Sequence, residues 1–323
     1  MTRFFSFKYV ARGLTVVAIG FLIWMVATSE LWPMLGDLDA DALPIFGAAV
    51  FVLTLHWLFP GLAWTILARR LADPPALSTG AHLTLFATTQ IQKYVPGNVF
   101  HFIVRHLEAR RRGESDEPLF WACVGELSGQ LVAAGLLAAL TLSLAAAGFA
   151  PAPVLLLVLL LLAITVVGLR VLQDLLPRLV GILVRLVGSR GRQWYQGIDL
   201  KKSPLNTPDL LVVLPLYALY IGTLGVVAWS LSLAVEPSLS LQLLPYVIGW
   251  TAIAWTAGFV LPGAPGGLGA REAVLTGALY AVTSAETALF VALGLRLCTI
   301  LSDLFFFALG VLARSIAADE LES

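Results

Sequence analysis

The residues that could do chemistry in this chain gather around two breaks in otherwise apolar sequence. The first break is a Pro-Gly pair at 96–97, inside the stretch QKYVPGNVFHFIVRH. The second is LPGAPGGLGARE at 261–272, which contains two prolines and four glycines. Ionisable side chains are costly inside a membrane and are by default candidates for function there. Ionisable side chains lie beside both breaks, so the breaks and these side chains are considered together.

A helix that restarts after a break points free backbone N–H groups and the positive end of its dipole away from its first turn. Asn98 can cap the helix after the first break, and Glu272 stands early in the helix after the second, where an acid is favoured. Arg105 lies two turns beyond Asn98, and Arg271 lies in the first turn of the second helix. If both breaks reach the middle of the membrane, the positive ends converge. We therefore predict an anion site, for which phosphate is the natural occupant.

Polar residues of two apolar segments complete the predicted site. Glu126 and Gln130 are one turn apart, and Arg296 and Asp303 are seven residues apart, so the members of each pair share one face of a helix. No catalytic residue, metal site or cofactor is expected. The residues predicted to bind the lipid headgroup or its phosphate are Lys93, Pro96, Gly97, Asn98, His101, Arg105, Glu126, Gln130, Gly267, Gly269, Arg271, Glu272, Arg296 and Asp303.

Structural explanations compete with this hypothesis. A Pro-Gly pair can simply turn a loop. Arg296 and Asp303 can form a structural salt bridge, with each other or with Glu126. For His106 and the arginines at 110–112 we prefer the interpretation that they are cations at the membrane interface.

The composition is that of a membrane protein. Of the 323 residues, 59% are hydrophobic and only 12% charged, and the mean hydropathy is +0.89. Several apolar runs are long enough to cross a bilayer. The formal net charge is zero, and the motifs GxSxG, HExxH, CxxC and Walker A are absent from the sequence. No segment outside the membrane is long enough to be expected to fold as a catalytic domain, so we predict that the protein is not an enzyme.

We predict an all-α polytopic protein with six full spans, at 14–32, 44–68, 118–147, 152–172, 209–235 and 286–313. Basic residues before the first span, at Arg69-Arg70 and throughout the loop 173–208 define the cytoplasmic side by the positive-inside rule. Both termini are therefore expected in the cytoplasm. The first apolar run is expected to stay as an uncleaved helix.

Two further apolar segments, 81–112 and 243–283, must each enter and leave the membrane on one side. From His82 to Val95 there are 14 residues, about 21 Å of helix, whereas a hydrocarbon core is about 30 Å thick. We therefore predict a re-entrant hairpin broken at Pro96-Gly97. The arms of the second segment are longer, so either a re-entrant hairpin or two complete spans fit it.

The order of spans and hairpins occurs twice with opposite orientation, in units at about 44–147 and 209–313. This is an inverted-topology repeat, an architecture typical of secondary transporters. The chain is predicted to be one transmembrane domain over residues 1–316, followed by a polar tail at 317–323.

Three stretches resemble the lysylphosphatidylglycerol synthase transmembrane-region family: KYVPGNVFHFIVRHLEARRRGES, GELSGQ and LPGAPGGLGAREAVL. The resemblance covers roughly residues 10 to 314. This family comprises the flippase part of bacterial multiple-peptide-resistance proteins and many stand-alone membrane proteins. The residues that match its motifs are Pro96, Gly97, Arg105, Pro262, Gly263, Gly267, Gly269, Arg271 and Glu272. Many members carry Gly-Glu soon after the first Pro-Gly pair, whereas this chain has Asn98 through His101 there.

The resemblance implies a flippase that moves an anionic lipid, either a polyprenyl-phosphate-linked lipid or an aminoacylated or anionic phospholipid. Two other classes remain open. One is a membrane enzyme acting on a lipid phosphate, with Glu126 or Glu272 as base. The other is a non-catalytic scaffold for a membrane glycosyltransferase. The expected partner is the lipid substrate, and no nucleic acid is expected to bind. A lipid-modifying enzyme, a glycosyltransferase or a second copy of the chain is left open as a further partner.

Overall fold

The structure is a computed structural model that describes residues 42–95, 99–147, 203–261 and 265–322, besides isolated positions between 13 and 28 and between 167 and 178. For residues 317–322 it describes the backbone only. Two predicted spans, 14–32 and 152–172, therefore lie outside the described ranges, as does most of the basic loop. Pro96, Gly97 and Asn98 at the first break, and residues 262–264 at the second, also lie outside them.

All regular structure in the described ranges is helical. The elements are α3 (Ala42–His56), α4 (Leu58–Leu71), α5 (Thr79–Gln90), η1 (Ile91–Tyr94), α6 (Phe100–Arg111), α7 (Asp116–Ala147), α10 (Thr207–Val235), η2 (Leu241–Leu243), α11 (Leu244–Val260), η3 (Pro265–Gly267), α12 (Ala270–Tyr280) and α13 (Ala285–Glu322).

Five stretches of helix are long and apolar enough to cross a membrane: Leu43–Leu71, Asp116–Ala146, Thr207–Val235, Leu241–Val260 and Ala285–Ile316. The protein is therefore a multi-pass membrane protein. Four of the five coincide with predicted spans, and the fifth is the first arm of the second hairpin segment, which was left open between a re-entrant arm and a span.

One of these five spans is interrupted. α3 and α4 follow one another with only Trp57 between them. Pro60 lies three residues beyond Trp57 and has no N–H group to donate to the carbonyl of His56, and its ring crowds that carbonyl. The interruption therefore occurs where a helical hydrogen bond is missing, and Trp57 is 4% exposed in the interior.

The first hairpin has two short arms. α5 and α6 contain 12 residues each, about 18 Å of helix, less than a hydrocarbon core of about 30 Å. Ser78 caps α5, because its Oγ accepts the N–H of Ala81 at 3.2 Å. α6 begins at Phe100, and its N-cap residue is Val99, which makes no side-chain cap. Asn98, which the sequence suggests as a cap, lies outside the described residues.

The second hairpin turns on glycines. Gly266, Gly267 and Gly269 have φ angles of 57°, 77° and 81°, in the left-handed region that side chains disfavour. α12 then begins at Ala270, and the N–H of Gly269 donates to Oε2 of Glu272 at 2.6 Å. Glu272 therefore stabilises the start of the helix, as the sequence predicts, and already satisfies one of the N–H groups at that end.

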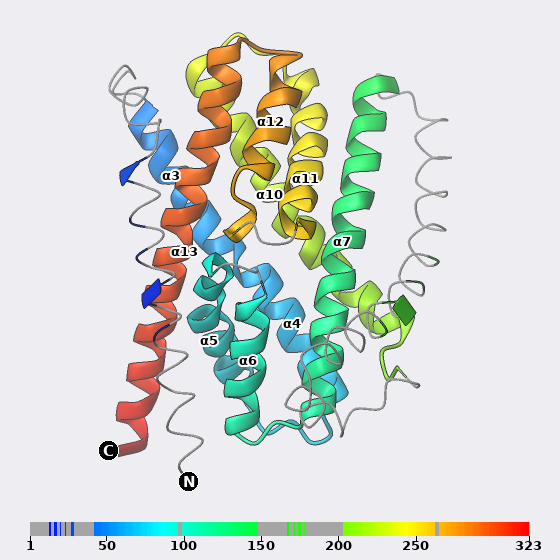
Figure 1. The fold of residues 1–323 in the computed structure, drawn as a ribbon, viewed down its shortest axis with the longest axis vertical. Helices are drawn as coiled ribbons and strands as arrows, with labels where there is room; N and C mark the ends of the chain where they lie inside the picture. Colours follow the sequence, from blue (N-terminus) through cyan, green and yellow to red (C-terminus); the bar gives the residue numbers. More distant parts are fainter. Residues whose placement is uncertain are drawn as a thin grey trace.

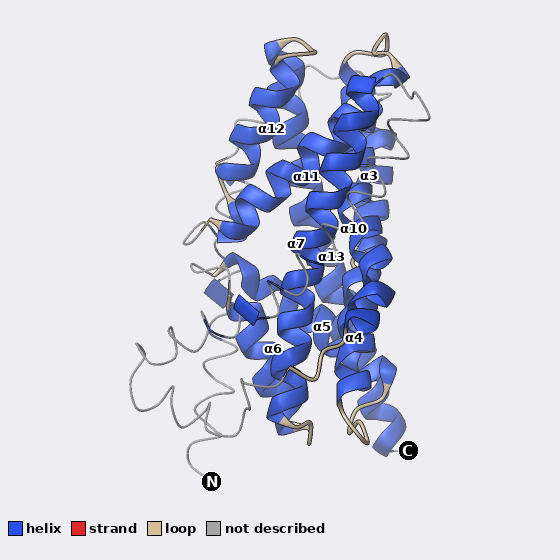
Figure 2. Cartoon of the chain, turned by 90° about the vertical axis from the view of Figure 1, so that its right-hand side faces the viewer, coloured by secondary structure: helices blue, strands red, loops and turns tan. Residues whose placement is uncertain are grey.

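The two hairpins occupy opposite halves of the molecule. α5 and α6 lie in the lower half of the molecule in Figure 1, and α11 and α12 lie in the upper half. The side view shows the same arrangement (Figure 2). Their tips meet, because η1 contacts η3. A Cβ on Gly266 would lie 2.7 Å from a ring carbon of Tyr94, so the backbone of the second tip rests directly on a side chain of the first.

The helices of the two halves pack in corresponding pairs. α7 packs along the first arm of the second hairpin, α11, and α13 packs along the first arm of the first hairpin, α5. Likewise α6 contacts α7, and α12 contacts α13. Small residues allow close approach, as is common between membrane helices: a Cβ on Gly310 of α13 would lie 2.6 Å from that of Ala87 in α5.

Candidate functional site

Seven charged side chains gather where the hairpin tips meet. Three cation–carboxylate pairs account for six of them: Lys93 with Asp303, Arg105 with Glu126, and Arg296 with Glu272. The seventh is Arg271. Buried ions are costly unless they are paired, so each member of the cluster needs an explanation.

The first pair joins the tip of the first hairpin to α13. Lys93 Nζ lies 2.7 Å from Asp303 Oδ2 and 4.2 Å from the centre of the Trp57 ring. The hydroxyl of Tyr94 donates to the same carboxylate oxygen. Asp303 is 4% exposed, and it receives two donors from consecutive residues of η1. Through Asp303, the tip of one half is bound to the last helix of the other.

The second pair joins α6 to α7 and is fully enclosed. Arg105 is 0% and Glu126 1% exposed, and Nη2 of the arginine donates to Oε2 of the glutamate. The guanidinium carbon lies 4.6 Å from the ring centres of both Trp64 and Phe86, a cation–π arrangement. Gln130 donates to the other carboxylate oxygen at 3.3 Å.

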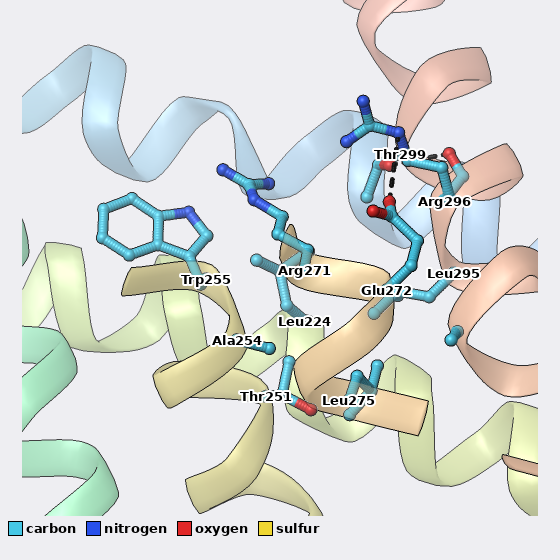
Figure 3. Close-up of a pocket in the computed structure, with 11 residues that line it drawn as sticks. Leu224, Thr251, Ala254, Trp255, Arg271, Glu272, Leu275, Leu295, Arg296 and Thr299 are labelled. Carbon is cyan, nitrogen blue, oxygen red and sulfur yellow. Dashed lines mark hydrogen bonds and ion pairs between the residues drawn. The ribbon is translucent and has the colours of Figure 1, made fainter. Parts of the chain in front are cut away.

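The third pair joins α12 to α13. Nε of Arg296 lies 3.5 Å from Oε1 of Glu272, and its Nη1 donates to the carbonyl of Gly266 at 2.8 Å. Arg296 therefore fixes both the first turn of α12 and the glycine turn before it. Figure 3 shows the ion pair as a dashed line.

The second and third pairs occupy corresponding places with their charges exchanged. In the first half, the cation Arg105 is on the second hairpin arm and the anion Glu126 is the eleventh residue of α7. In the second half, the anion Glu272 is on the second hairpin arm and the cation Arg296 is the twelfth residue of α13. Each half thus holds its hairpin to its final helix by one buried ion pair.

Arg271 differs from the other cations. Within the described part of the chain it makes no hydrogen bond or ion pair, and its Nε is buried without a partner. Its guanidinium carbon lies 5.8 Å from the centre of the Trp255 ring. In Figure 3 the guanidinium points away from the carboxylate of Glu272 and toward the side where Trp255 lies.

Two glycines make the space that Arg271 fills. A Cβ on Gly258 of α11 would lie 2.7 Å from Nε of Arg271, and a Cβ on Gly267 would also lie 2.7 Å from that atom. Both distances are shorter than a van der Waals contact, so any larger residue would displace the guanidinium. The packing of the glycines therefore defines where this cation lies.

Arg271 lies between two small cavities of about 30 Å³ each. The first cavity is polar and is lined by Trp57, Gln90, Lys93, His101, Glu126, Gln130, Tyr220, Trp255, Phe259, Gly266 and Arg271. The second is mainly apolar and runs between α10, α11, α12 and α13 (Figure 3). Each has room for about two water molecules, which is less than a lipid headgroup requires, so a headgroup can enter only if the hairpins move.

A family model for the lysylphosphatidylglycerol synthase TM region matches residues 10–310. The chain belongs to this family. The resemblance predicted from the sequence motifs is thereby confirmed over nearly the whole chain, and the protein is assigned to a lipid-related membrane family. No curated protein matches the chain. The match to the TM region includes both hairpins and all seven charged residues of the cluster.

Within this TM region, the structure brings together most of the residues that the sequence predicts. Lys93, His101, Glu126, Gln130 and Arg271 line one cavity. Arg105, Gly267 and Asp303 contact members of this set. Glu272 and Arg296 line the second cavity together with Arg271, and Gly269 supplies the N-cap of α12. Pro96, Gly97 and Asn98 lie outside the described residues.

One interpretation made from the sequence requires correction. Arg296 and Asp303 do not pair with each other or with Glu126, because each reaches a different hairpin. His106, interpreted as an interfacial cation, is 3% exposed, and its Nε2 lies 3.0 Å from Oδ1 of Asp116, at the start of α7.

The sequence gives weaker signals for other residues of the site. Trp57 and Trp255 look like ordinary packing residues of apolar helices, yet one lies under Lys93 and the other near Arg271. Tyr94 could have been noticed only as the neighbour of Lys93. Gly258 is a single glycine in an apolar helix, and its role depends on a side chain from α12.

Metal chemistry finds no support in the described residues, which contain no group of three His, Cys, Asp or Glu side chains placed to hold an ion. The chemistry that the cluster offers is the binding of an anion: a guanidinium with unused donors next to a polar cavity, and three ion pairs that hold its surroundings in place.

Proposed function

We propose that this protein moves an anionic lipid, a polyprenyl-phosphate-linked lipid or an aminoacylated or anionic phospholipid, across the bacterial inner membrane. The observation that carries the proposal is Arg271. It is a guanidinium without a hydrogen-bonded anion in the described structure, at the point where two hairpins from opposite halves meet. An arginine binds a phosphate through two parallel hydrogen bonds. A lipid phosphate would supply the counter-ion that this cation lacks.

The architecture supports movement rather than binding alone. The corresponding helix pairs of the two halves, and the hairpins that enter from opposite ends, fit an inverted-topology repeat with six spans and two re-entrant hairpins. In transporters of that kind the substrate site lies near the membrane midplane, at the interface of the repeats. Arg271 lies at such an interface, because Gly258 and Gly267 on one side and the η1 tip on the other enclose it.

In this proposal the present conformation is occluded. Headgroup entry requires one hairpin to move away from the other tip, and the contacts that hold the tips are the Lys93–Asp303 pair and the packing of Tyr94 on Gly266. The two ion pairs within the halves can persist during that motion, because each joins elements of one half only. Alternate opening on the two sides would expose Arg271 to each leaflet in turn.

The enzyme alternative is less well supported by the site. A general base needs a carboxylate that can reach substrate. Glu126 is held by Arg105 and Gln130, and Glu272 is held by Arg296 and the N–H of Gly269. We therefore propose that the protein is not an enzyme.

Reconstitution tests this proposal directly. The purified protein is inserted into liposomes that contain phosphatidylglycerol with a fluorescent label on one acyl chain, and a membrane-impermeant reductant destroys the label in the outer leaflet. Movement predicts that nearly all of the fluorescence is lost, against about half in empty liposomes. Fluorescence loss equal to that of empty liposomes would contradict the proposal, and a chemically changed lipid would favour the enzyme.

Gly258→Ala is expected to slow lipid movement strongly in this assay, because the added methyl group occupies the position of the Arg271 side chain. Gly277→Ala in α12 is the matched control, since a Cβ there meets nothing within 4 Å. The control is expected to move lipid normally and to gain up to about 1 kcal/mol of helix stability. Equal transport by the two variants would show that the position of Arg271 is unimportant.

Cysteine labelling tests the proposed topology, in a background in which Cys123 and Cys298 are replaced. Single cysteines at Asp39 and Glu236 are expected to react with an impermeant reagent from outside, and one at Ser189 only after permeabilisation. Cysteines near Gly97 and Gly266 should be partly protected from impermeant reagents on both sides, because both breaks are expected to lie deep. Labelling of position 189 in intact cells would refute the orientation, and free labelling of position 266 would refute the buried tip.

A further inference from the structure

The charges of the cluster do not sum to zero. Lys93, Arg105 and Arg296 are balanced by Asp303, Glu126 and Glu272, one carboxylate for each cation. Arg271 leaves one positive charge over. Histidines are counted as neutral here, as in the formal charge of the whole chain. The cluster in the described structure therefore has a net charge of +1.

This imbalance matters because most of the cluster is shielded from water. Arg105, Glu126, Arg296 and Asp303 are all less than 9% exposed, and the cavities beside them hold about two water molecules each. Charges in such surroundings interact much more strongly than in water. A ligand with one negative charge would neutralise the site, whereas a second negative charge would have no cation left to balance it.

Besides Arg271, the polar cavity is lined by neutral side chains with unpartnered polar atoms. His101 is 4% exposed and has no hydrogen-bond partner for Nδ1, and Gln90 is 9% exposed and has none for Oε1. Both residues line the polar cavity with Arg271. Such groups suit hydroxyls on the remainder of a headgroup. They do not suit an ammonium group, because every carboxylate of the cluster already has a cationic partner and Trp57 already faces Lys93.

We infer that the headgroup recognised here is a monoanion, a phosphodiester whose remaining groups are neutral and bear hydroxyls. This inference rests on the proposed function and narrows it. A glycerol or sugar joined through one phosphodiester has this chemistry. A pyrophosphate or phosphomonoester carries more negative charge than the site can balance, and a zwitterionic or aminoacylated headgroup carries an ammonium that finds no free carboxylate.

The test compares three lipids with identical labelled acyl chains in the reconstituted protein: phosphatidylglycerol, phosphatidic acid and phosphatidylethanolamine. Phosphatidylglycerol is expected to move at least about tenfold faster than the other two, a difference of about 1.4 kcal/mol. Equal rates for all three would overturn the inference and leave the proposed function intact. If no lipid moves, the proposed function fails and the inference fails with it.

Two charge variants sharpen the comparison. Asp303→Asn raises the net charge of the cluster to +2 while the amide oxygen can still accept from Tyr94, so the preference is expected to shift toward phosphatidic acid. The double variant Asp303→Asn with Lys93→Gln returns the net charge to +1, and preference for phosphatidylglycerol should return. An unchanged preference in Asp303→Asn would also overturn the inference. Thermal unfolding in detergent identifies a variant that fails to fold. In that case the comparison of the three lipids with the unaltered protein tests the inference.

Discussion

Arg271→Ala is expected to slow lipid movement severely in proteoliposomes and to leave the protein folded. A hydrogen bond to a charged group contributes about 1.5–3 kcal/mol, so loss of the guanidinium should slow movement by about tenfold to a hundredfold. Folding should persist, because Arg271 makes no ion pair in the described structure and its removal strands no carboxylate. Arg271→Lys should recover only part of the rate, since lysine keeps the charge but loses the planar pair of donors.

The control for this change is Arg110→Ala. The side chain of Arg110 is 51% exposed at the end of α6. Its loss should therefore change neither the rate of lipid movement nor the stability of the protein measurably. Normal movement by Arg271→Ala would mean that the glycine-rich break is only a turn. If Arg271→Ala lost both lipid movement and the folded state, Arg271 would be required for folding. Arg271→Lys alone would then test the anion site.

Arg105→Met should destabilise the protein more than any other single change in the cluster. It leaves Glu126, 1% exposed, as an unpaired buried carboxylate, and breaking such a pair costs about 3–5 kcal/mol. The double variant Arg105→Met with Glu126→Gln should recover most of that loss, because it removes both charges and the amide can still accept from Gln130. Thermal or denaturant unfolding in detergent measures both.

The corresponding pair in the second half provides an internal comparison. Arg296→Met should lower the free energy of unfolding by less than Arg105→Met does. Nε of Arg296 lies 3.5 Å from Glu272, and the side chain of Glu272 is 17% exposed. Water can therefore partly solvate the carboxylate that remains. If Arg105→Met were as stable as the unaltered protein, the Arg105–Glu126 pair would not hold α6 to α7, and its enclosure by Trp64 and Phe86 would have another explanation.

The positions of the two helix breaks and of the charged residues beside them could be predicted from sequence because they depend on local features. Glycine and proline interrupt helices wherever they occur, the distance from His82 to the first break is too short for a span, and Arg271 with Glu272 directly follows the second break. Those predictions agree with 12-residue arms for α5 and α6 and with the position of Glu272 in the first turn of α12.

The partners of the charged residues could not be predicted, because they depend on tertiary packing. Tyr94 and Asp303 are 209 residues apart, and no periodicity in either segment connects them. Seven-residue spacing put Arg296 and Asp303 on one helix face, which suggested that they pair. In the structure the two hairpin tips lie against that face, and each residue pairs with a different tip.

The central claim is that Arg271 binds the phosphate of a lipid between the hairpin tips. A cryo-electron microscopy structure of the protein in nanodiscs containing phosphatidylglycerol tests it most directly. We expect headgroup density between η1 and the start of α12, with phosphate oxygens about 2.7–2.9 Å from the guanidinium nitrogens of Arg271. Lipid phosphate bound elsewhere, with the space beside Arg271 empty or filled by a protein carboxylate, would contradict it.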